Sequence, residues 1–368
     1  MRTLWIKKSA YDRKVWEALL AKAGIRPENA INHTVGIFEG EVLVGTASRL
    51  DNIIKCVAID PDYRGGAVFN SLLSHMIQTI YREGYDRIFV YTKPSALAAF
   101  EALSFHKIES VGDDLVFLER AETGFSAYLE GLRKWKEKTQ RGDEKEVAAI
   151  VMNANPFTRG HLALVEAARK ASDVLYLFTV SDPSSVFPFE IRKRLVEEGV
   201  AHLDRVHVLT TESYMVSRAV FPSYFLKEAN QATAIQARLD ARIFKNHIAP
   251  ALGISLRFVG EEPFSPATRT YNEQMEAVFA GPPNPGKPRL DIIPRLEAGG
   301  EAISASTVRR LLARGQFEEA KRLLPPSSQA FLDSPEARPI LEALKKDPLQ
   351  GIKEADVQKL VDEVRYDI

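Results

Sequence analysis

The sequence predicts an α/β protein with two domains, in which a smaller α/β domain precedes a doubly wound parallel sheet. Its 368 residues are enough to build two separate hydrophobic cores. From residue 147 onward, short apolar runs alternate with segments of helical periodicity, which is typical of βαβ units with right-handed crossovers. Before that point, two apolar runs are joined by a short turn, which indicates an antiparallel hairpin.

Residues 1–128 are expected to form the smaller domain, because strand and helix patterns follow one another over this stretch. Two apolar runs separated by Glu39 and Gly40 predict a β-hairpin. The long helix expected later in this domain has apolar residues three and four positions apart. In chain order the strands are expected at residues 34–38, 41–47, 53–59, 87–92 and 114–118, and the helices at 67–83 and 94–103.

A charged segment, residues 129–146, connects this domain to the next. It is expected to be helical as far as Gly142. Its mixed charges are typical of a solvated linker, and a docking stripe for an acidic carrier protein is the alternative.

The second domain is expected to span residues 147–330, with a helical, charged extension at 331–368 to which the sequence assigns no role. Its buried strands are expected at 147–152, 174–180, 206–209 and 255–259. A doubly wound sheet binds ligands at the carboxyl ends of its strands. At or near these ends stand Thr158, Ser181, Thr210 and Gly260.

The segment 153–161 lies between the buried run 147–152 and a helix with one apolar face. Thr158 and His161 are three residues apart and can lie on one side of the first helical turn. Gly160 lets a ligand approach the backbone closely. A strand, a glycine-containing turn and a helix N-terminus favour an anion, and an imidazole can donate to a phosphate oxygen. The alternative for a histidine at a helix start is a surface or capping role.

A second segment, residues 303–309, opens another helix that is expected to run from Ser304 to Arg314. Ser304 can cap this helix, and Arg309 can bind phosphate with its planar guanidinium. Alone, such a serine is an ordinary N-cap. Together the two segments predict a site that holds a nucleoside triphosphate.

The motif Thr-x-Gly-His at 158–161 and the motif Ile-Ser-x-Ser-x-Val-Arg at 303–309 resemble the nucleotidyltransferase superfamily. Five further segments are similar to the citrate lyase ligase family, namely 155–158, 187–190, 217–222, 224–228 and 258–264. The similarity extends over residues 147–324 and into the N-terminal third. It implies that ATP and acetate give acetyl-adenylate and pyrophosphate. The acetyl group then passes to the thiol of the dephospho-CoA-derived prosthetic group on the acyl carrier subunit of citrate lyase.

The same resemblance implies roles for individual residues. Thr158 and His161 are expected to be catalytic and to contact the triphosphate near the reacting phosphorus. The residues expected to bind ATP are Asn155, Pro156, Phe157, Thr158, Gly160, His161, Gly260, Ser304, Ser306, Thr307 and Arg309. Mg²⁺ is expected to accompany the nucleotide with several of its waters, and no metal site made of protein ligands is predicted.

A substrate pocket is the suggested role of Glu190, Arg192, Arg218 and Lys227. Three of them have an ordinary alternative. Glu190 at a helix start can interact with the helix dipole, and Arg218 and Lys227 can be solvated charges. Two other functions stay open, a simple adenylyltransferase that joins a nucleotide to a phosphorylated metabolite and a nucleotide-binding regulator.

The first domain resembles the GNAT acyltransferase family in its order of elements, in Arg-Gly-Gly at residues 64–66 and in the segment 99–108. This resemblance implies a pantetheine site at Arg64, Gly65 and Gly66. Ala67 and Phe69 stand where the family's phosphate loop has glycines. A scaffold without catalysis of its own is therefore the alternative to an acyltransferase.

Composition limits the remaining classes of function. The net charge is zero, so no large basic field suggests a nucleic-acid partner. One cysteine is compatible with a reducing cytoplasm, and residues 1–10 lack an apolar signal core. No stretch reaches the roughly 18 apolar residues of a spanning helix. We therefore expect a cytoplasmic protein with no membrane partner.

Overall fold

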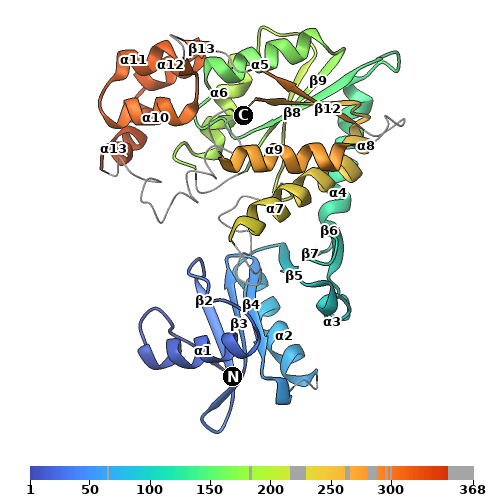
Figure 1. Cartoon of the computed structure of the whole chain (residues 1–368), viewed down its shortest axis with the longest axis vertical. Coiled ribbons are helices and arrows are strands. Elements are labelled where there is room, and N and C mark those ends of the chain that lie inside the picture. The colour runs from blue at the N-terminus through green and yellow to red at the C-terminus, as the bar shows by residue number, and fades with distance from the viewer. Residues whose placement is uncertain are drawn as a thin grey trace. The chain divides into compact units, whose positions relative to one another are not determined.

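The computed structural model describes residues 1–63, 66–181, 185–215, 229–261, 266–280, 288–294, 297–298 and 301–346. Helices and strands both occur throughout these ranges, and they alternate around the parallel sheet, so the predicted α/β fold class is confirmed (Figure 1). The chain divides into two compact units. The first consists of Met1–Tyr128 and Arg218–Leu239, and the second of Leu129–Ser217 and Asp240–Ile368.

The first unit contains a mixed seven-stranded sheet in the order β1-β2-β3-β4-β5-β7-β6. Its strands are β1 (Arg2–Thr3), β2 (His33–Glu39), β3 (Val42–Leu50), β4 (Ile53–Ile59), β5 (Arg87–Thr92), β6 (His106–Val111) and β7 (Leu115–Ala121). β4 and β5 are parallel and pair at Ile53 with Phe89 and at Ile54 with Val90, whereas the other neighbours are antiparallel. The backbone pairing between β4 and β5 is thus limited to the start of β4.

Two long helices pack against this sheet. In α2 (Ala67–Arg82), which matches the predicted helix, the residues that face the core are Leu72, Leu73, Met76, Ile77 and Ile80. The sequence did not indicate α1 (Ala10–Lys22), because one of its buried positions is the polar residue Asp12. Asp12 accepts hydrogen bonds from the Arg2 guanidinium at 2.8 Å and from the Trp5 backbone N–H at 2.9 Å. These contacts satisfy the carboxylate, so its burial is tolerated.

The remaining elements of this unit are short. The helix predicted at 94–103 is a 3₁₀ turn (Pro94–Ala96) followed by α3 (Leu97–Glu101), and another 3₁₀ turn spans Pro61–Tyr63. The edge strand β6 was not predicted, because its sequence carries the polar residue His106 and the charged residues Lys107 and Glu109. Charged residues of this kind are common on sheet edges.

The second unit contains a five-stranded parallel sheet in the order β10-β9-β8-β11-β12. Its strands are β8 (Val147–Met152), β9 (Val174–Thr179), β10 (Val206–Thr210), β11 (Leu256–Gly260) and β12 (Arg289–Ile293). The first four were predicted, and the half-polar edge strand β12 was not. The chain passes from β8 to β9 and β10 on one side, then continues as β11 and β12 on the other. The topological switch point, where doubly wound sheets bind ligands, lies between β8 and β11.

Helices precede, follow and connect these strands. They are α4 (Gly124–Thr139), α5 (Arg159–Lys170), α6 (Phe189–Val200), α7 (Ala229–Ile243), α8 (Ala249–Leu252), α9 (Pro266–Phe279), α10 (Ala305–Ala313), α11 (Phe317–Arg322), α12 (Pro326–Asp333) and α13 (Arg338–Lys346). The first part of α4, up to Tyr128, and most of α7, up to Leu239, belong to the first unit. A π-helical turn (Phe244–Ile248), a 3₁₀ turn (Pro335–Ala337) and a small hairpin of β13 (Glu297–Ala298) and β14 (Glu301–Ala302) complete the unit.

One hydrophobic core joins α5, α6 and α10 to α13 with one face of this sheet. Phe331, Ile340 and Leu344 belong to it, so residues 331–346 pack with the sheet, and the rest of the predicted extension lies outside the described residues. On the other face, Phe178 of β9 contacts Phe244, which in turn contacts Phe279 of α9. The sheet is therefore covered on both faces, as a doubly wound sheet requires.

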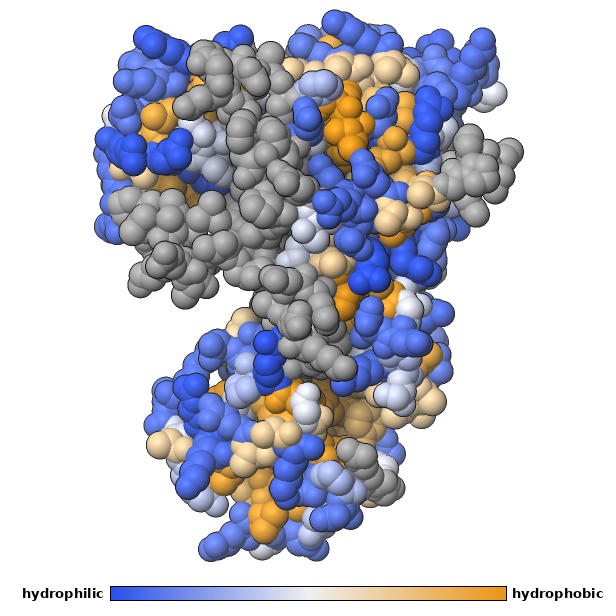
Figure 2. All heavy atoms as spheres, in the orientation of Figure 1, coloured by the Kyte–Doolittle hydropathy of each residue, from blue (hydrophilic) through white to orange (hydrophobic). Residues whose placement is uncertain are grey.

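The face shown in Figure 2 carries hydrophilic residues with scattered apolar areas, as expected when the large apolar residues fill internal cores. In the part of the chain that the structure describes, no helix combines the length and apolar character needed to cross a bilayer.

Lys55 of β4 is an unusual core residue, because its side chain is fully buried. Its ammonium lies 3.7 Å from a Glu28 carboxylate oxygen, and Glu28 also accepts a hydrogen bond from the Ala30 N–H at 3.0 Å. Burial lowers the pKa of the Lys55 ammonium by more than Glu28 raises it. The loss of hydration therefore destabilises the charged ammonium by more than its attraction to the Glu28 carboxylate stabilises it.

We predict that Lys55→Met stabilises the first unit at pH 8 by on the order of 1 kcal/mol, because the desolvated charge is removed while Glu28 keeps a donor. A lowered pKa means that the wild type gains stability as pH rises toward the ordinary value of 10.5, and the variant should lack this rise. Calorimetry between pH 8 and 10 measures both effects. Arg13→Met, which removes an ion pair between the two exposed side chains of Arg13 and Glu17, is the control with little change. A Lys55→Met protein less stable than the wild type at pH 8 would contradict the argument.

Candidate functional site

The turn after β8 contributes buried polar groups to the carboxyl edge of the sheet. Asn153 and Asn155 are buried. Ala154 between them has a φ of +52°, a left-handed backbone conformation that residues other than glycine rarely adopt. The Asn155 Oδ1 accepts a hydrogen bond from the Phe187 N–H at 2.9 Å, which fixes the amide. Its Nδ2 is buried without a hydrogen-bond partner among the described residues. Asn155 therefore presents a fixed donor that a ligand can satisfy.

Thr158 and His161 form a reciprocal cap at the start of α5. The Thr158 Oγ1 accepts a hydrogen bond from the His161 backbone N–H at 3.3 Å, and the Thr158 backbone N–H donates to His161 Nδ1 at 3.0 Å. Because Nδ1 is the acceptor, the neutral imidazole carries its proton on Nε2. The ring also stacks on Phe157, with centroids 5.8 Å apart. The spacing of three residues thus produces both a cap and a fixed Nε2–H donor.

The second motif begins α10 with a similar cap. The Ser304 Oγ accepts a hydrogen bond from the Thr307 N–H at 3.1 Å and donates to the Thr307 Oγ1 at 3.0 Å. The buried Arg309 donates from Nη2 to the Ser306 Oγ at 3.0 Å and from Nη1 to the Asn155 carbonyl oxygen. This last bond joins the two motifs across 154 positions of sequence.

Gly160 lies where the two motifs meet. A β-carbon at this position would lie 2.9 Å from the Ile303 carbonyl oxygen and 3.5 Å from the Ile303 Cβ. The sequence suggested that this glycine admits a ligand, whereas the close neighbour in the structure is the backbone that leads into the second motif. The glycine is needed here because two backbone segments pack closer than a side chain allows.

Gly260 reaches the same edge of the sheet from β11, which is the parallel neighbour of β8. It is buried and paired in register with Ile293, and the next residue, Glu261, donates its backbone N–H to the Ile293 carbonyl at 2.8 Å. It lies beside the switch point between β8 and β11.

Arg192 and Glu190, both suggested for a substrate pocket, lie in different environments. Arg192 is fully buried, and its guanidinium donates to three backbone carbonyl oxygens, those of Asn153 at 2.6 Å, Val180 at 2.9 Å and Phe187 at 2.9 Å. Glu190 is exposed in the first turn of α6, where a carboxylate interacts favourably with the helix dipole. The other two suggested residues, Arg218 and Lys227, lie outside the described residues.

Two hydrogen bonds to the segment 323–328 also fix the first motif. The sequence did not indicate them. The buried Ser328 of α12 donates to the Phe157 carbonyl oxygen at 2.7 Å, and the Arg159 backbone N–H donates to the Leu323 carbonyl oxygen at 2.9 Å. A serine in a proline-rich helix start gives no sequence signal for such a role. Over the described ranges, no cluster of three or more His, Cys, Asp or Glu side chains is arranged to hold a metal ion.

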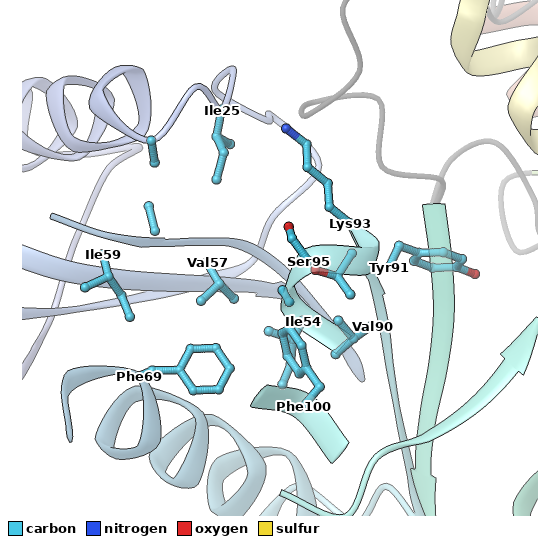
Figure 3. Close-up of a pocket in the computed structure, with 14 residues that line it drawn as sticks. Ile25, Ile54, Val57, Ile59, Phe69, Val90, Tyr91, Lys93, Ser95 and Phe100 are labelled. Carbon is cyan, nitrogen blue, oxygen red and sulfur yellow. The ribbon is translucent and has the colours of Figure 1, made fainter. Parts of the chain in front are cut away.

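The first unit has a pocket of its own, between β4 and β5. Figure 3 shows its apolar wall and, at its mouth, the side chains of Lys93 and Ser95. Its volume is about 310 Å³. The apolar side chains that line it include Ile54, Val57, Ile59, Phe69, Val90 and Phe100. The pocket lies where β4 and β5 no longer pair, after the short paired stretch at Ile53 and Ile54.

Part of the predicted pantetheine site can be placed in the structure. Arg64 and Gly65 lie outside the described residues. Gly66 has a φ of +80° and immediately precedes α2. Phe69, one turn into that helix, lines the pocket and makes an edge-to-face contact with Phe100 at 5.2 Å. A bulky residue in the place of a loop glycine thus forms part of the pocket wall.

Comparisons with known proteins give a consistent picture. Residues 147–332 match the family "Citrate lyase ligase C-terminal domain". The chain is 36% identical to the citrate (pro-3S)-lyase ligase of Klebsiella pneumoniae over 79% of this chain and 83% of that protein. It is 36% identical to the corresponding ligase of Escherichia coli over 83% of this chain and 87% of that protein.

More distant matches cover shorter parts of the chain. A phosphopantetheine adenylyltransferase of Streptococcus gordonii is 30% identical over 27% of this chain and 63% of that protein. The crystal structure of an acyl-CoA N-acyltransferase from Pseudomonas aeruginosa matches 31% of this chain and 92% of that chain, with 14% identity and a TM-score of 0.27.

We predict that Gly160→Ala destabilises the second unit by about 1–3 kcal/mol, because the new methyl group forces the start of α5 away from the Ile303 carbonyl. Gly131→Ala is the matched control, since a β-carbon at this site in α4 meets no atom within 4 Å. It should stabilise the protein by about 0.5–1 kcal/mol. Thermal unfolding of both variants measures the difference. Equal stability of the two variants would show that the motifs do not pack as described.

Proposed function

The chain belongs to the citrate lyase ligase family, and we propose that it is the ligase that activates acetate with ATP and acetylates a carrier thiol of citrate lyase. The family assignment rests on the match over residues 147–332 and on 36% identity to two relatives over most of their length. The proposed products are acetyl-adenylate and pyrophosphate, followed by the acetyl thioester and AMP. The thiol belongs to the dephospho-CoA-derived prosthetic group of the acyl carrier subunit.

The observation that supports the ATP site best is the junction of the two motifs. The Asn155 carbonyl is bound by Arg309, and Gly160 allows the Ile303 backbone to pack against the start of α5. Two helix N-termini, those of α5 and α10, are thereby brought to the same place. The N-terminal turns of helices favour anions, so this junction suits a polyphosphate.

The proposed chemistry requires little covalent work from the protein. Acetate attacks the α-phosphorus of ATP, the bond to the β-phosphate oxygen breaks, and pyrophosphate leaves with the electron pair. Positioning two anions and compensating the charge that develops are the main requirements. His161 is well suited to this task because its Nε2–H donor is fixed by the Thr158 N–H on the other ring nitrogen. We assign His161 and Thr158 to the α-phosphate.

The second motif is assigned to the β- and γ-phosphates. Ser304, Ser306 and Thr307 are partly exposed at the start of α10. Arg309 is held beside them by its bonds to the Asn155 carbonyl oxygen and the Ser306 Oγ, and a planar guanidinium suits a phosphate group. Mg²⁺ is proposed to arrive with ATP and to keep several waters, since it is usually bound through substrate phosphates. Asn155 Nδ2, Pro156, Phe157 and Gly260 complete the proposed nucleotide site.

The first unit is proposed to hold the pantetheine-like arm of the carrier. Its pocket between β4 and β5 has a long apolar wall and polar groups at the mouth, which suits an arm with a mostly apolar chain. Arg64, Gly65 and Gly66 are proposed to bind its phosphate end. The pocket then has a role in thiol transfer that does not require acetyltransferase chemistry. A cytoplasmic location is proposed because both ATP and the carrier are substrates.

We predict that the wild-type protein catalyses an exchange between ATP and pyrophosphate that depends on acetate. His161→Ala should lower this exchange about 10²–10³-fold, because a preorganised donor to the developing charge is lost. Exchange is measured with labelled pyrophosphate, and circular dichroism shows whether the variant is folded. Exchange without any carboxylate, or dependent on a phosphorylated metabolite, would favour a simple adenylyltransferase. Near wild-type exchange in a folded variant would remove His161 from the reaction.

A second experiment separates the two steps. Ala96→Phe should fill the pocket of the first unit, which Ala96 lines, whereas Ala98→Phe places the same ring on an exposed position of α3. Both variants should keep acetate-dependent pyrophosphate exchange. Acetylation of the carrier thiol should fall at least about tenfold in Ala96→Phe alone, because the protein no longer binds and positions the arm. Equal transfer rates in the two variants would exclude the pocket as the site of the arm.

A further inference from the structure

Arg192 makes contacts that neither phosphate binding nor a substrate pocket explains. Its side chain is fully buried, and its guanidinium donates to the carbonyl oxygens of Asn153, Val180 and Phe187 at 2.6 to 2.9 Å. Asn153 follows β8, Val180 follows β9 and Phe187 precedes α6. One cation therefore ties together three segments that reach the carboxyl edge of the sheet.

Arg309 makes a related contact two residues further along the same turn. It donates to the Asn155 carbonyl, so the two carbonyl groups that flank Ala154 are each bound by a buried guanidinium. Ala154 has a φ of +52°, an uncommon conformation for a residue with a β-carbon. Such a conformation persists where the surroundings hold it in place, and here two arginines bind the carbonyl oxygens on either side of it.

We propose that Arg192 is a positioning residue of the ATP site, and that with Arg309 it keeps the carbonyl oxygens of Asn153 and Asn155 turned into the protein. This proposal rests on the proposed function for the identity of the ligand. Carbonyl oxygens carry partial negative charge and repel a triphosphate that approaches them. By binding these oxygens from inside, the arginines leave the Asn155 amide, fixed by Phe187, as the polar group offered to the ligand.

The same residue also couples the turn to α6. The Phe187 carbonyl that Arg192 binds is adjacent in sequence to Pro188, and the Phe187 N–H is the group that fixes the Asn155 amide. The guanidinium lies 5.6 Å from the Phe189 ring, a distance at which a cation is attracted to an aromatic face. Without Arg192, we expect both the turn at Asn153 and the Phe187 backbone to become less fixed. The Asn155 side chain, which depends on both, should then lose its defined position.

Arg169 provides a matched control within the same sheet. It also binds backbone carbonyl oxygens, those of Asp204 and Ser172, each at 2.7 Å. These carbonyls lie before β9 and β10, at the amino edge of the sheet. Its removal costs two hydrogen bonds to carbonyl oxygens, against three for Arg192, without touching the turn at residues 153–155.

The experiment measures ATP binding by calorimetry in the full-length protein, for Arg192→Lys, Arg192→Ala and Arg169→Ala. We expect the Kd for ATP to rise about tenfold in Arg192→Lys and further in Arg192→Ala, since lysine cannot reach three carbonyls at once. Arg169→Ala should bind ATP like the wild type. Guanidinium ion at millimolar concentration should partly restore binding in Arg192→Ala, and it should leave the other two variants unchanged.

The outcomes separate this proposal from the proposed function. An unchanged Kd for ATP in a folded Arg192→Lys protein would overturn the positioning role, as would equal losses in Arg192→Ala and Arg169→Ala. Should Arg192→Ala fail to fold, Arg192→Lys and its binding curve decide the matter. A wild type that binds ATP but shows no acetate-dependent exchange would refute the acetate ligase and leave the role of Arg192 standing.

Discussion

The hydrogen bond from Arg309 to the Asn155 carbonyl is the contact on which the candidate site depends. It connects the turn after β8 to the second turn of α10, two segments separated by 154 positions of sequence. Neither segment makes a triphosphate site alone, because each offers one helix N-terminus and a few hydroxyl or imidazole groups. A charge-assisted bond between buried partners is strong and directional. It therefore fixes both the distance between the motifs and their orientation.

Around this contact the protein uses backbone carbonyls as anchor points. Arg192, Arg309 and Ser328 each donate to a carbonyl between Asn153 and Phe157. The amide and imidazole donors of this segment are in turn fixed by backbone N–H groups, as the Phe187 and Thr158 bonds show. The carbonyl oxygens, which carry negative partial charge, thus have donors within the protein. The side chains of Asn155 and His161 are held in place. This arrangement suits a site that must attract an anion and hold it during a displacement.

Each half of the proposed reaction has its own place in the fold. The five-stranded parallel sheet supplies a switch point between β8 and β11, where adenylation is proposed. The mixed sheet of the first unit supplies the pocket between β4 and β5, where the arm that carries the thiol is proposed to bind. The first site consists of helix starts and polar donors, and the second is mostly an apolar wall. They suit a polyphosphate and a flexible apolar arm respectively.

The sequence alone determined the fold class, most strands and the two motifs, because apolar periodicity and spacing of three residues are local properties. The cap between Thr158 and His161 follows from such spacing. Only the tertiary structure decided that Gly160 faces the Ile303 backbone and that Arg192 binds three carbonyls inside the protein. It also decided that α13 packs against α10 in the hydrophobic core of the second unit. Those partners come from distant elements, so the chain must fold before they are neighbours, and no local pattern encodes them.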